Sequence, residues 1–248
     1  MKTSYFLNIF QKIKSRGKLE SFQPSLLSLL INPFFFIRRG LYKYIKTDAE
    51  NLHGVLLDFG CGRKPYKNLF NVKEYIGVDI KQSGHSHECS EIDVYYDGKS
   101  IPFNDEYFDS VFCSEVIEHV FEIDNILNEI NRVMKTNGKI LLTVPFVWND
   151  HEVPYDYGRY STYGITYLLE KHGFEIIKIS KSTNFMETVF QLGILYIHLL
   201  IKTRYKILNV FLNIIIISPF TLIGYVFSKF LPARYDLYNN SIILARKR

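Results

Sequence analysis

The chain has 248 residues, of which 47% are hydrophobic and 22% charged, and its formal net charge is +5. This length allows one large core, or a core with a small appendage. Three cysteines without framework spacing argue against a disulfide scaffold, and the first residues contain too short an apolar run for a signal peptide. We therefore expect a cytoplasmic protein in a reducing compartment.

The charges are unevenly distributed along the chain. Residues 1–50 carry nine Lys/Arg and three Asp/Glu, residues 51–181 carry thirteen and twenty, and residues 182–248 carry eight and two. The acidic centre suits a cationic ligand, although a solvated surface would also explain it. The basic flanks are rich in apolar residues, which is typical of contact with an anionic membrane surface. Because these flanks are so hydrophobic, no nucleic acid partner is expected.

Predicted helices and strands alternate along the chain. A helix is expected over Leu26–Lys46, where Asn32-Pro33 breaks or starts it, and further helices over Ile123–Met134 and Thr162–His172. This alternation predicts an α/β fold with a mostly parallel sheet and helices on both faces. The predicted strands are Val55–Phe59, Tyr75–Asp79, Ile92–Tyr96, Ser110–Cys113, Ile140–Val144, Glu175–Ile179 and Ser241–Ala245.

The first strand leads into a glycine turn, Gly60-Cys61-Gly62, and the second strand ends at Asp79. A strand, a glycine turn, a helix and a second strand ending in an acid form the layout of a site for a ribose-bearing cofactor. Pro65 stands where the dinucleotide fingerprint has its third glycine, and it removes an N–H donor that a pyrophosphate would use. S-adenosylmethionine has no phosphate and does not need that glycine. Asp79 could accept hydrogen bonds from its two ribose hydroxyls.

From about Val55 to Ile179 the chain resembles the class I S-adenosylmethionine-dependent methyltransferases, in the group that includes the ubiquinone-biosynthesis methyltransferases. The chain departs from that family at Lys64 and Asn137, and neither change removes a group that must bind the cofactor. The motifs that carry the resemblance are Asp58-Phe59-Gly60-Cys61-Gly62, Asp79, the segment from Asp97 to Phe103, the segment from Phe108 to Val120, the segment from Glu129 to Lys139, and Ile140-Leu141-Leu142-Thr143-Val144-Pro145.

The resemblance implies a Rossmann-like, seven-stranded sheet whose last strand is antiparallel and lies between the fifth and sixth. It also implies S-adenosylmethionine as the cofactor. The alternatives are that the acids are merely solvated strand ends and that Asp97-Gly98 is an ordinary turn. The residues that we expect to bind the cofactor are Asp58, Gly60, Cys61, Gly62, Asp79, Asp97, Gly98, Cys113, Ser114 and Glu115.

A second informative segment, His151 to Ser161, follows the fifth strand. Ligand sites of open α/β sheets form at this edge. We predict His151 as a general base and Asp156 as its catalytic partner, with Tyr155 and Arg159 contacting the substrate. The alternative is a structural loop in which Arg159 pairs with Asp156.

No metal site is predicted from the sequence. His85, His87 and Cys89 form an H-x-H-x-C pattern, but no fourth ligand is evident. His119 is interpreted as a helix-start or core histidine more readily than as a site residue.

We expect three regions: an N-terminal helical extension over 1–50, a methyltransferase core over 51–181 and 232–248, and a hydrophobic helical hairpin over 182–231. The second half of the hairpin is long enough to cross a bilayer. A single crossing is excluded if the last strand completes the sheet. The alternatives are a hairpin lying in the membrane interface, a soluble cap or dimer surface, and a spanning hairpin that positive charges at 202, 204 and 206 disfavour.

The sequence thus predicts methyl transfer, with O-methylation of a glycan or lipid-linked intermediate as the preferred hypothesis. The motivation is a basic, apolar periphery beside a predicted soluble site. Quinone or other small-molecule methylation, and a non-catalytic membrane-associated protein with a relic fold, are the alternatives. A peripheral location on the inner face of the cell membrane would fit the preferred hypothesis.

Overall fold

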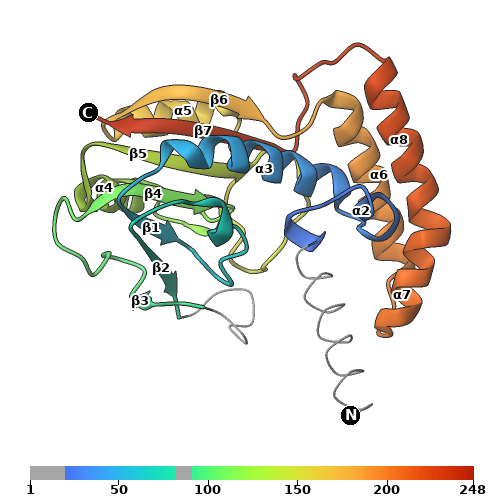
Figure 1. The fold of residues 1–248 in the computed structure, drawn as a ribbon, viewed down its shortest axis with the longest axis horizontal. Helices are drawn as coiled ribbons and strands as arrows, with labels where there is room; N and C mark the ends of the chain where they lie inside the picture. Colours follow the sequence, from blue (N-terminus) through green and yellow to red (C-terminus); the bar gives the residue numbers. More distant parts are fainter. Residues whose placement is uncertain (1–19, 82–90) are drawn as a thin grey trace. The chain divides into compact units, whose positions relative to one another are not determined.

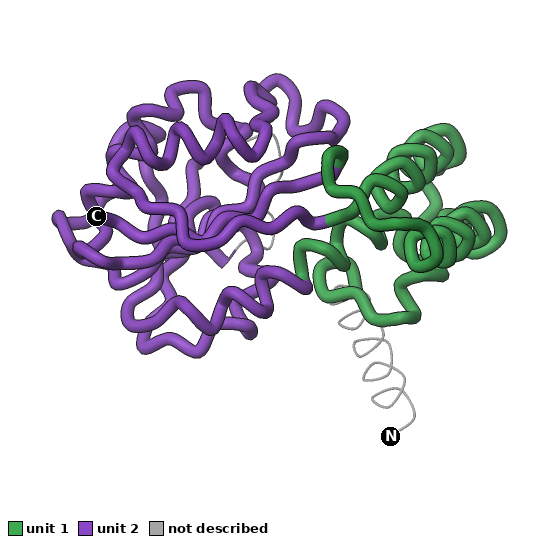
Figure 2. Tube along the Cα trace, turned by 90° about the horizontal axis from the view of Figure 1, so that it is seen from above, with its two compact units in different colours: residues 1–42, 183–237 green, residues 43–182, 238–248 purple. Residues whose placement is uncertain are grey.

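The computed structural model describes residues 20–81 and 91–248 (Figure 1). The H-x-H-x-C pattern at 85–89 lies outside these residues. The chain divides into two compact units (Figure 2). One contains the described residues up to Tyr42 together with Thr183–Leu237, and the other contains Lys43–Ser182 and Tyr238–Arg248.

The larger unit is built on one sheet with the strand order β3-β2-β1-β4-β5-β7-β6. Strands β1 to β5 pair in parallel, and β7 is antiparallel to both β5 and β6. This confirms the predicted fold class, including the position of the last strand. The strands are β1 (Val55–Phe59), β2 (Glu74–Ile80), β3 (Val94–Tyr96), β4 (Phe108–Ser114), β5 (Met134–Pro145), β6 (Phe174–Lys181) and β7 (Asn240–Lys247).

The central strands are buried on both faces, as their continuous apolar runs require. On one face, Val111 and Cys113 of β4 belong to a core cluster with residues of α4 (Ile123–Val133) and α5 (Thr162–Lys171). On the other face, Phe112 packs against Tyr66 and Phe70, with ring centroids 6.1 and 4.8 Å away. Short 3₁₀ turns link the remaining segments: η1 (Ala49–Asn51), η2 (Lys67–Leu69) and η3 (Ile117–His119).

The strand order reverses between β1 and β4, which are neighbours in the sheet. β1 is followed along the chain by β2 on one side, whereas β4 is followed by β5 on the other. Phe59 at the end of β1 lies opposite Cys113 near the end of β4. Parallel open sheets bind ligands at the carboxyl ends of strands at such a reversal. The fold therefore brings the segments after β1, β2, β4 and β5 to one edge.

The smaller unit is helical. The helix expected over 26–46 is broken at Asn32-Pro33 into α2 (Ser28–Ile31) and α3 (Phe35–Asp48), of which α3 continues into the larger unit. After β6 come α6 (Phe185–Ile201) and a helical run of α7 (Lys206–Leu212), the π-helical turn η4 (Asn213–Ile217) and α8 (Ser218–Phe230).

Buried polar contacts fix these helices together. The Gln191 side chain of α6 accepts hydrogen bonds from the amides of Phe36 and Ile37 and donates one to the carbonyl of Pro33. Those three groups lie at or just before the first turn of α3, where backbone amides lack intrahelical partners. A small apolar core of Leu29, Phe35, Phe36, Ile194 and Ile217 packs around this contact.

Candidate active site

The glycine turn after β1 is closed by its own hydrogen bonds. The amides of Gly60 and Cys61 donate to the carbonyl of Val78, at 2.8 and 3.2 Å. Gly60 has φ of 72°, and a Cβ there would lie 2.3 Å from Cγ2 of Val116. Gly62 has φ of 48°, but a Cβ on it would meet nothing within 4 Å. The turn therefore packs tightly at Gly60 and presents an open backbone face at Gly62.

Asp58 is the last residue but one of β1 and is buried. Its Oδ2 accepts a hydrogen bond of 2.7 Å from the hydroxyl of Tyr75 on β2. Burial raises the pKa of this carboxyl to about 7, and the Tyr75 hydrogen bond works in the opposite direction. Asp58 therefore carries its proton or its charge depending on small changes near neutral pH.

Asp79 lies at the end of β2, beside the glycine turn. Its Oδ2 accepts the amide of Gly62 at 2.8 Å, and its Oδ1 accepts the amide of Ile80 at 2.7 Å. Because each carboxylate oxygen has two lone pairs, Asp79 keeps acceptor capacity for further donors.

Lys64 forms an ion pair with Asp93, which also accepts the amide of Gly77 at 2.6 Å. The Lys64 side chain is buried, although sequence reasoning treated this position only as a departure from the usual small residue. The positive charge of its ammonium group offsets the negative charge of one carboxylate. Three carboxylates approach this turn, those of Asp58, Asp79 and Asp93.

Asp97 lies in an exposed turn after β3. Its Oδ1 accepts the amides of Lys99 and Ser100, at 2.8 and 2.9 Å, and these hydrogen bonds lower the pKa of the carboxyl. This is the Asp-Gly turn that the sequence offered as the alternative, with Gly98 at φ of 83°. The adenine contact of Asp97 and Gly98 stays a prediction.

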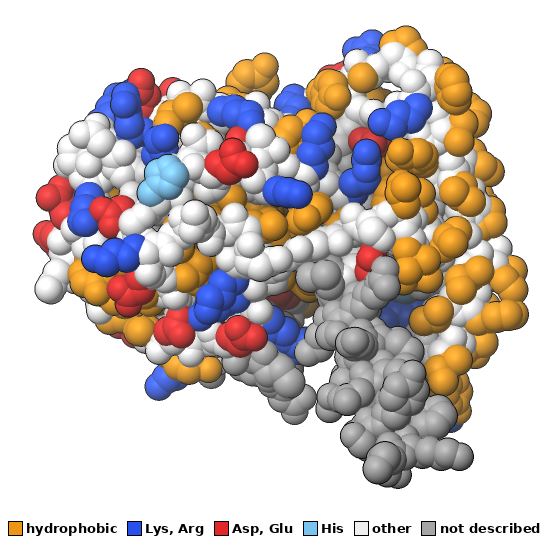
Figure 3. Space-filling model, viewed as in Figure 1, with side chains coloured by type: hydrophobic (Ala, Val, Ile, Leu, Met, Phe, Trp, Pro, Cys, Tyr) orange, Lys and Arg blue, Asp and Glu red, His pale blue; other side chains and the backbone are white. Residues whose placement is uncertain are grey.

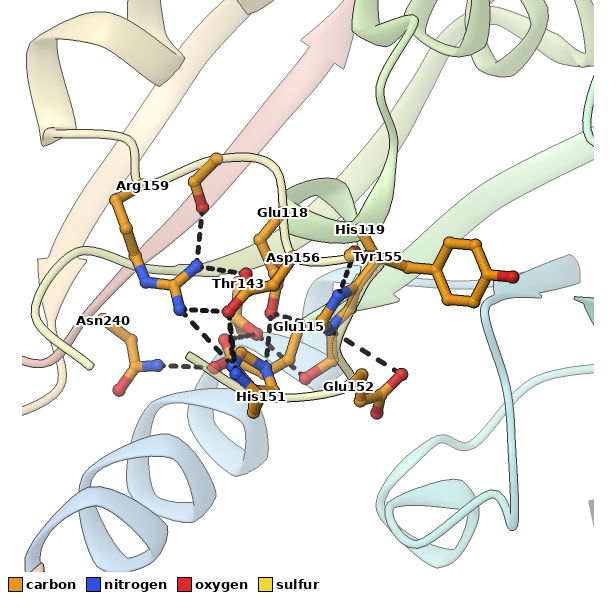
Figure 4. A network of polar contacts seen from close by, with 12 residues as sticks. Glu115, Glu118, His119, Thr143, His151, Glu152, Tyr155, Asp156, Arg159 and Asn240 are labelled. Atoms are coloured by element: carbon orange, nitrogen blue, oxygen red, sulfur yellow. Dashed lines mark hydrogen bonds and ion pairs between the residues drawn. The ribbon is translucent and has the colours of Figure 1, made fainter. Parts of the chain in front are cut away.

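The segment after β4 is tied to its neighbouring strands through Glu115. This carboxylate accepts hydrogen bonds from the Thr143 hydroxyl (2.8 Å) and the Asn240 side-chain amide (2.6 Å) (Figure 4). The Ser114 hydroxyl lies 2.9 Å from the Thr143 hydroxyl. Cys113 lies in the apolar core, where burial raises the pKa of its thiol well above the ordinary value. Of the three residues predicted here to bind the cofactor, Cys113 thus has its side chain in the core, whereas Ser114 and Glu115 have theirs at the end of the strand.

The segment after β5 brings His151, Asp156 and Arg159 together. Arg159 forms a bidentate ion pair with Asp156, which is the pairing expected if this segment is a structural loop. The hydrogen bonds from Arg159 lower the pKa of Asp156 to about 2. The Asp156 Oδ2 lies 3.2 Å from Nδ1 of His151 and accepts the His151 amide at 2.9 Å. Asp156 therefore stays ionised and orients His151, rather than carrying a proton itself.

Glu118 is the residue at this site that sequence reasoning missed. It is fully buried, and neither carboxylate oxygen has a hydrogen-bond donor among the described residues. Its Oε1 lies 3.7 Å from Nε2 of His119 and 3.8 Å from Nε2 of His151 (Figure 4). Burial raises the pKa of Glu118 to about 7. The signal in the sequence was the Glu-His pair a few residues beyond the fourth strand.

The two predicted substrate residues behave differently in this cluster. The backbone carbonyl oxygen of Tyr155 lies 2.9 Å from Nδ1 of His119, whereas the ring of Tyr155 points away from the cluster (Figure 4). Arg159 is held by Asp156 and by the carbonyls of Gly158 and Asn149. Their contacts to a substrate, like the catalytic roles of His151 and Asp156, stay predictions.

Comparisons with known proteins bear on what this edge binds. A family model described as "Methyltransferase domain" matches residues 57–142. An uncharacterized methyltransferase of Bacillus subtilis, YcgJ, is 29% identical over 123 residues, covering 45% of this chain and 46% of its own. The uncharacterized protein MJ0638 of Methanocaldococcus jannaschii is 29% identical over 126 residues, covering 49% and 54%. The matches span about half the length of these curated relatives.

Residues 57–142 therefore carry a methyltransferase domain. Among solved structures, the chain resembles a Thermotoga maritima S-adenosylmethionine-dependent methyltransferase, with 15% identity, a TM-score of 0.54, and coverage of 87% of this chain and 93% of that one. It also resembles Haemonchus contortus phosphoethanolamine N-methyltransferase 2 in complex with S-adenosylmethionine, with 16% identity, a TM-score of 0.52, and coverage of 94% and 59%. At these identities the structural matches show the fold.

The predicted family and fold are thus confirmed, with S-adenosylmethionine as the cofactor of the family. The residues at the β1–β2 edge fit this cofactor. Gly62 leaves open space that a side chain would fill, and the acids Asp58 and Asp79 suit a cationic sulfonium. Asp58, Gly62 and Asp79 are the residues that would hold the cofactor. Gly60 and Cys61 close the turn through their amides, and the predicted cofactor contacts of all five residues stay predictions.

Proposed function

We propose that this methyltransferase transfers a methyl group from S-adenosylmethionine to a hydroxyl of a glycan or lipid-linked acceptor. The observation that carries this proposal is a shared sheet edge. The acidic glycine turn follows β1, and the cluster of Glu118, His119 and His151 follows β4 and β5. Val116, two residues before Glu118, packs against Gly60 of the turn. A cofactor on the turn and an acceptor at the cluster would therefore be neighbours.

The bound cofactor supplies an electrophilic methyl group on a positively charged sulfur. A new oxygen–carbon bond forms as the sulfur–carbon bond breaks, S-adenosylhomocysteine is left, and the hydroxyl proton must leave the acceptor oxygen. The polar cluster after β4 and β5 is the place where that proton can be accepted. Holding the acceptor in line with the methyl group is the larger contribution, and alignment of this kind is worth about 7–11 kcal/mol.

The choice of a lipid-linked acceptor is supported by the helical unit. Hydrophobic side chains gather along α7 and α8 (Figure 3), where Ile207 and Phe230 are 87% and 85% exposed. The run Lys206–Phe230 is long and apolar enough to cross a membrane, and only 28% of its most apolar window is buried. Lys202 and Arg204 precede this run, and Lys206 begins it. Exposed apolar area next to basic side chains suits an anionic lipid surface on the cytoplasmic side.

The proposal is tested with labelled cofactor and a membrane-containing cell extract. Pure protein is incubated with methyl-labelled S-adenosylmethionine and the extract, and label is measured in the organic and aqueous phases. We expect label in the organic phase, in an alkali-stable ether linkage. Uptake only into water-soluble material would contradict the lipid-linked acceptor, and no uptake above that of an Asp79→Asn control would contradict methyl transfer.

A further inference from the structure

Two imidazoles and one carboxylate converge on a point after β4 and β5. Nε2 of His119 and Nε2 of His151 lie 3.7 and 3.8 Å from Oε1 of Glu118. One ligand atom from each residue lies within 4.8 Å of the others. These separations are too long for hydrogen bonds, so the three groups do not satisfy one another.

Hydrogen-bond partners on the other side of each ring determine where the imidazole protons lie. Nδ1 of His119 lies 2.9 Å from the carbonyl of Tyr155, which can only accept, so Nδ1 carries the proton. Nδ1 of His151 lies 3.2 Å from Oδ2 of Asp156 and 3.3 Å from the carbonyl of Asn149. Nη2 of Arg159, which can only donate, also approaches Nδ1, at 3.4 Å, but the two nearer groups are acceptors and place the proton on Nδ1. Both Nε2 lone pairs therefore face Glu118.

The environment of the Glu118 carboxylate also points to a bound ligand. Its side chain is fully buried, and its oxygens lack donors among the described residues. A buried carboxylate without a partner is costly, and it is normally paired or coordinates a metal. Three electron-rich atoms facing one point favour a positive centre between them.

We infer that Glu118, His119 and His151 bind one divalent transition-metal ion. Two imidazole nitrogens and one carboxylate form a set that binds zinc in catalytic sites, with the fourth position open. Tetrahedral zinc places its ligand atoms about 3.4 Å apart, so the two Glu118–histidine pairs need to close by less than about half an ångström. The Tyr155 carbonyl and the Asp156 carboxylate are the outer partners that metal-bound histidines usually have.

The ion and the general-base role exclude one another at His151. Nε2 has one lone pair, and it either accepts a proton or binds the metal. If the proposed transfer to a hydroxyl holds, the ion would bind the acceptor oxygen at its open position and lower the pKa of that hydroxyl, whose proton then leaves to solvent water instead of to the cluster. Metal binding itself does not rest on the proposed function.

The test measures zinc binding by isothermal titration calorimetry on the full chain after treatment with EDTA. Because the H-x-H-x-C segment could bind zinc by itself, every protein in the series carries His85→Ala and His87→Ala. Glu118→Gln and His119→Ala remove ligands, Asp156→Asn removes an outer partner, and His53→Ala removes an exposed imidazole elsewhere. Thermal unfolding and S-adenosylmethionine binding report whether each variant is folded.

We expect one zinc ion per chain in the background protein and in His53→Ala. Binding should be lost in Glu118→Gln and His119→Ala, and weakened about 10–100-fold in Asp156→Asn. Cobalt should give the visible absorption of a four-coordinate site, and magnesium should bind at least 100-fold more weakly. An absence of stoichiometric zinc binding in the folded background protein would overturn the inference, as would unchanged affinity in folded Glu118→Gln. Either result leaves cofactor binding and methyl transfer to be judged by their own experiments.

Discussion

At the scale of single residues, the chain places an unusual number of carboxylates in buried positions. Asp58 and Glu118 both have pKa values raised to about 7 by burial, whereas Asp156 is held near 2 by Arg159. The difference lies in the partner: a guanidinium compensates Asp156, while a neutral tyrosine hydroxyl serves Asp58. Such contrasts in pKa are common at functional sites.

Asp58 makes the stability of the larger unit depend on pH. Its folded-state pKa of about 7 exceeds its ordinary value of 3.8, so the folded state holds this proton more tightly. The stability contributed by that proton is present below about pH 4 and is lost as pH rises to about 7, by an amount on the order of 4 kcal/mol. Asp58→Asn should remove this loss.

Chemical denaturation between pH 4 and pH 8 measures the effect. The wild-type protein should lose stability relative to Asp58→Asn as pH rises, whereas the exposed Glu122→Gln control should follow the wild type. Parallel curves for Asp58→Asn and the wild type would show that Asp58 is not buried as the structure has it.

The two glycines of the first turn should respond differently to alanine. Both have positive φ, which costs alanine about 1–2 kcal/mol. At Gly60 the new methyl group would also collide with Val116, whereas at Gly62 it meets nothing. Thermal unfolding should therefore rank the wild type first, Gly62→Ala second and Gly60→Ala last. Equal melting temperatures for the two variants would contradict the packing described for this turn.

At the scale of secondary structure, the strands and their order could be predicted because apolar runs and strand-end acids are local signals. Val55–Phe59 was predicted with its observed bounds, and β7 was placed correctly between β5 and β6. The length of β5, which begins at Met134, was underestimated, because Lys135 to Gly138 resemble a turn. Met134 pairs with Phe108 of β4, and regular pairing resumes only at Lys139, after an irregularity in register.

The site was predictable only in part, for a physical reason. The glycine turn and the acids after β1 and β2 are close in sequence and carry a recognisable spacing. Glu118 has no such spacing, because its burial depends on the segment after β5 folding over it: the amides of Tyr157 and Gly158 both donate to the Glu118 carbonyl. A contact between residues so far apart in the sequence cannot be predicted from a local sequence pattern.

The start of α6 offers a test of element stability in the helical unit. Asn184 accepts the amide of Glu187, and Glu187 accepts the amide of Asn184, which forms a capping box. Asn184→Ala should destabilise this unit by about 1 kcal/mol in urea denaturation. Ser161→Ala is the matched cap of α5 in the larger unit. An Asn184→Ala variant with unchanged stability would contradict the capping box.

At the scale of the whole molecule, the exposed apolar surface of α8 is the feature that a purely soluble enzyme would not need. Phe220, Phe227 and Phe230 are 45%, 47% and 85% exposed. We expect the protein to co-sediment with vesicles containing anionic lipid, less so at high salt, and the triple Phe→Ser variant to stay in solution. A matched Tyr163→Ser and Tyr167→Ser variant on α5 should still bind.

Equal co-sedimentation with neutral and with anionic vesicles would show that Lys202, Arg204 and Lys206 do not contribute to lipid binding. If the wild-type protein did not co-sediment with either kind of vesicle, the proposal that α8 contacts a membrane would be wrong. The main support for a lipid-linked acceptor would then be lost.

The central claim is that the turn after β1 and the acid after β2 bind S-adenosylmethionine. Calorimetric titration of the folded protein with this compound tests the claim most directly. We predict one molecule bound per chain, with affinity reduced about 10–100-fold in Asp79→Asn, because hydrogen bonds to a charged group are worth about 1.5–3 kcal/mol. Absence of binding to the wild-type protein, or the same affinity in Asp79→Asn, would contradict the account.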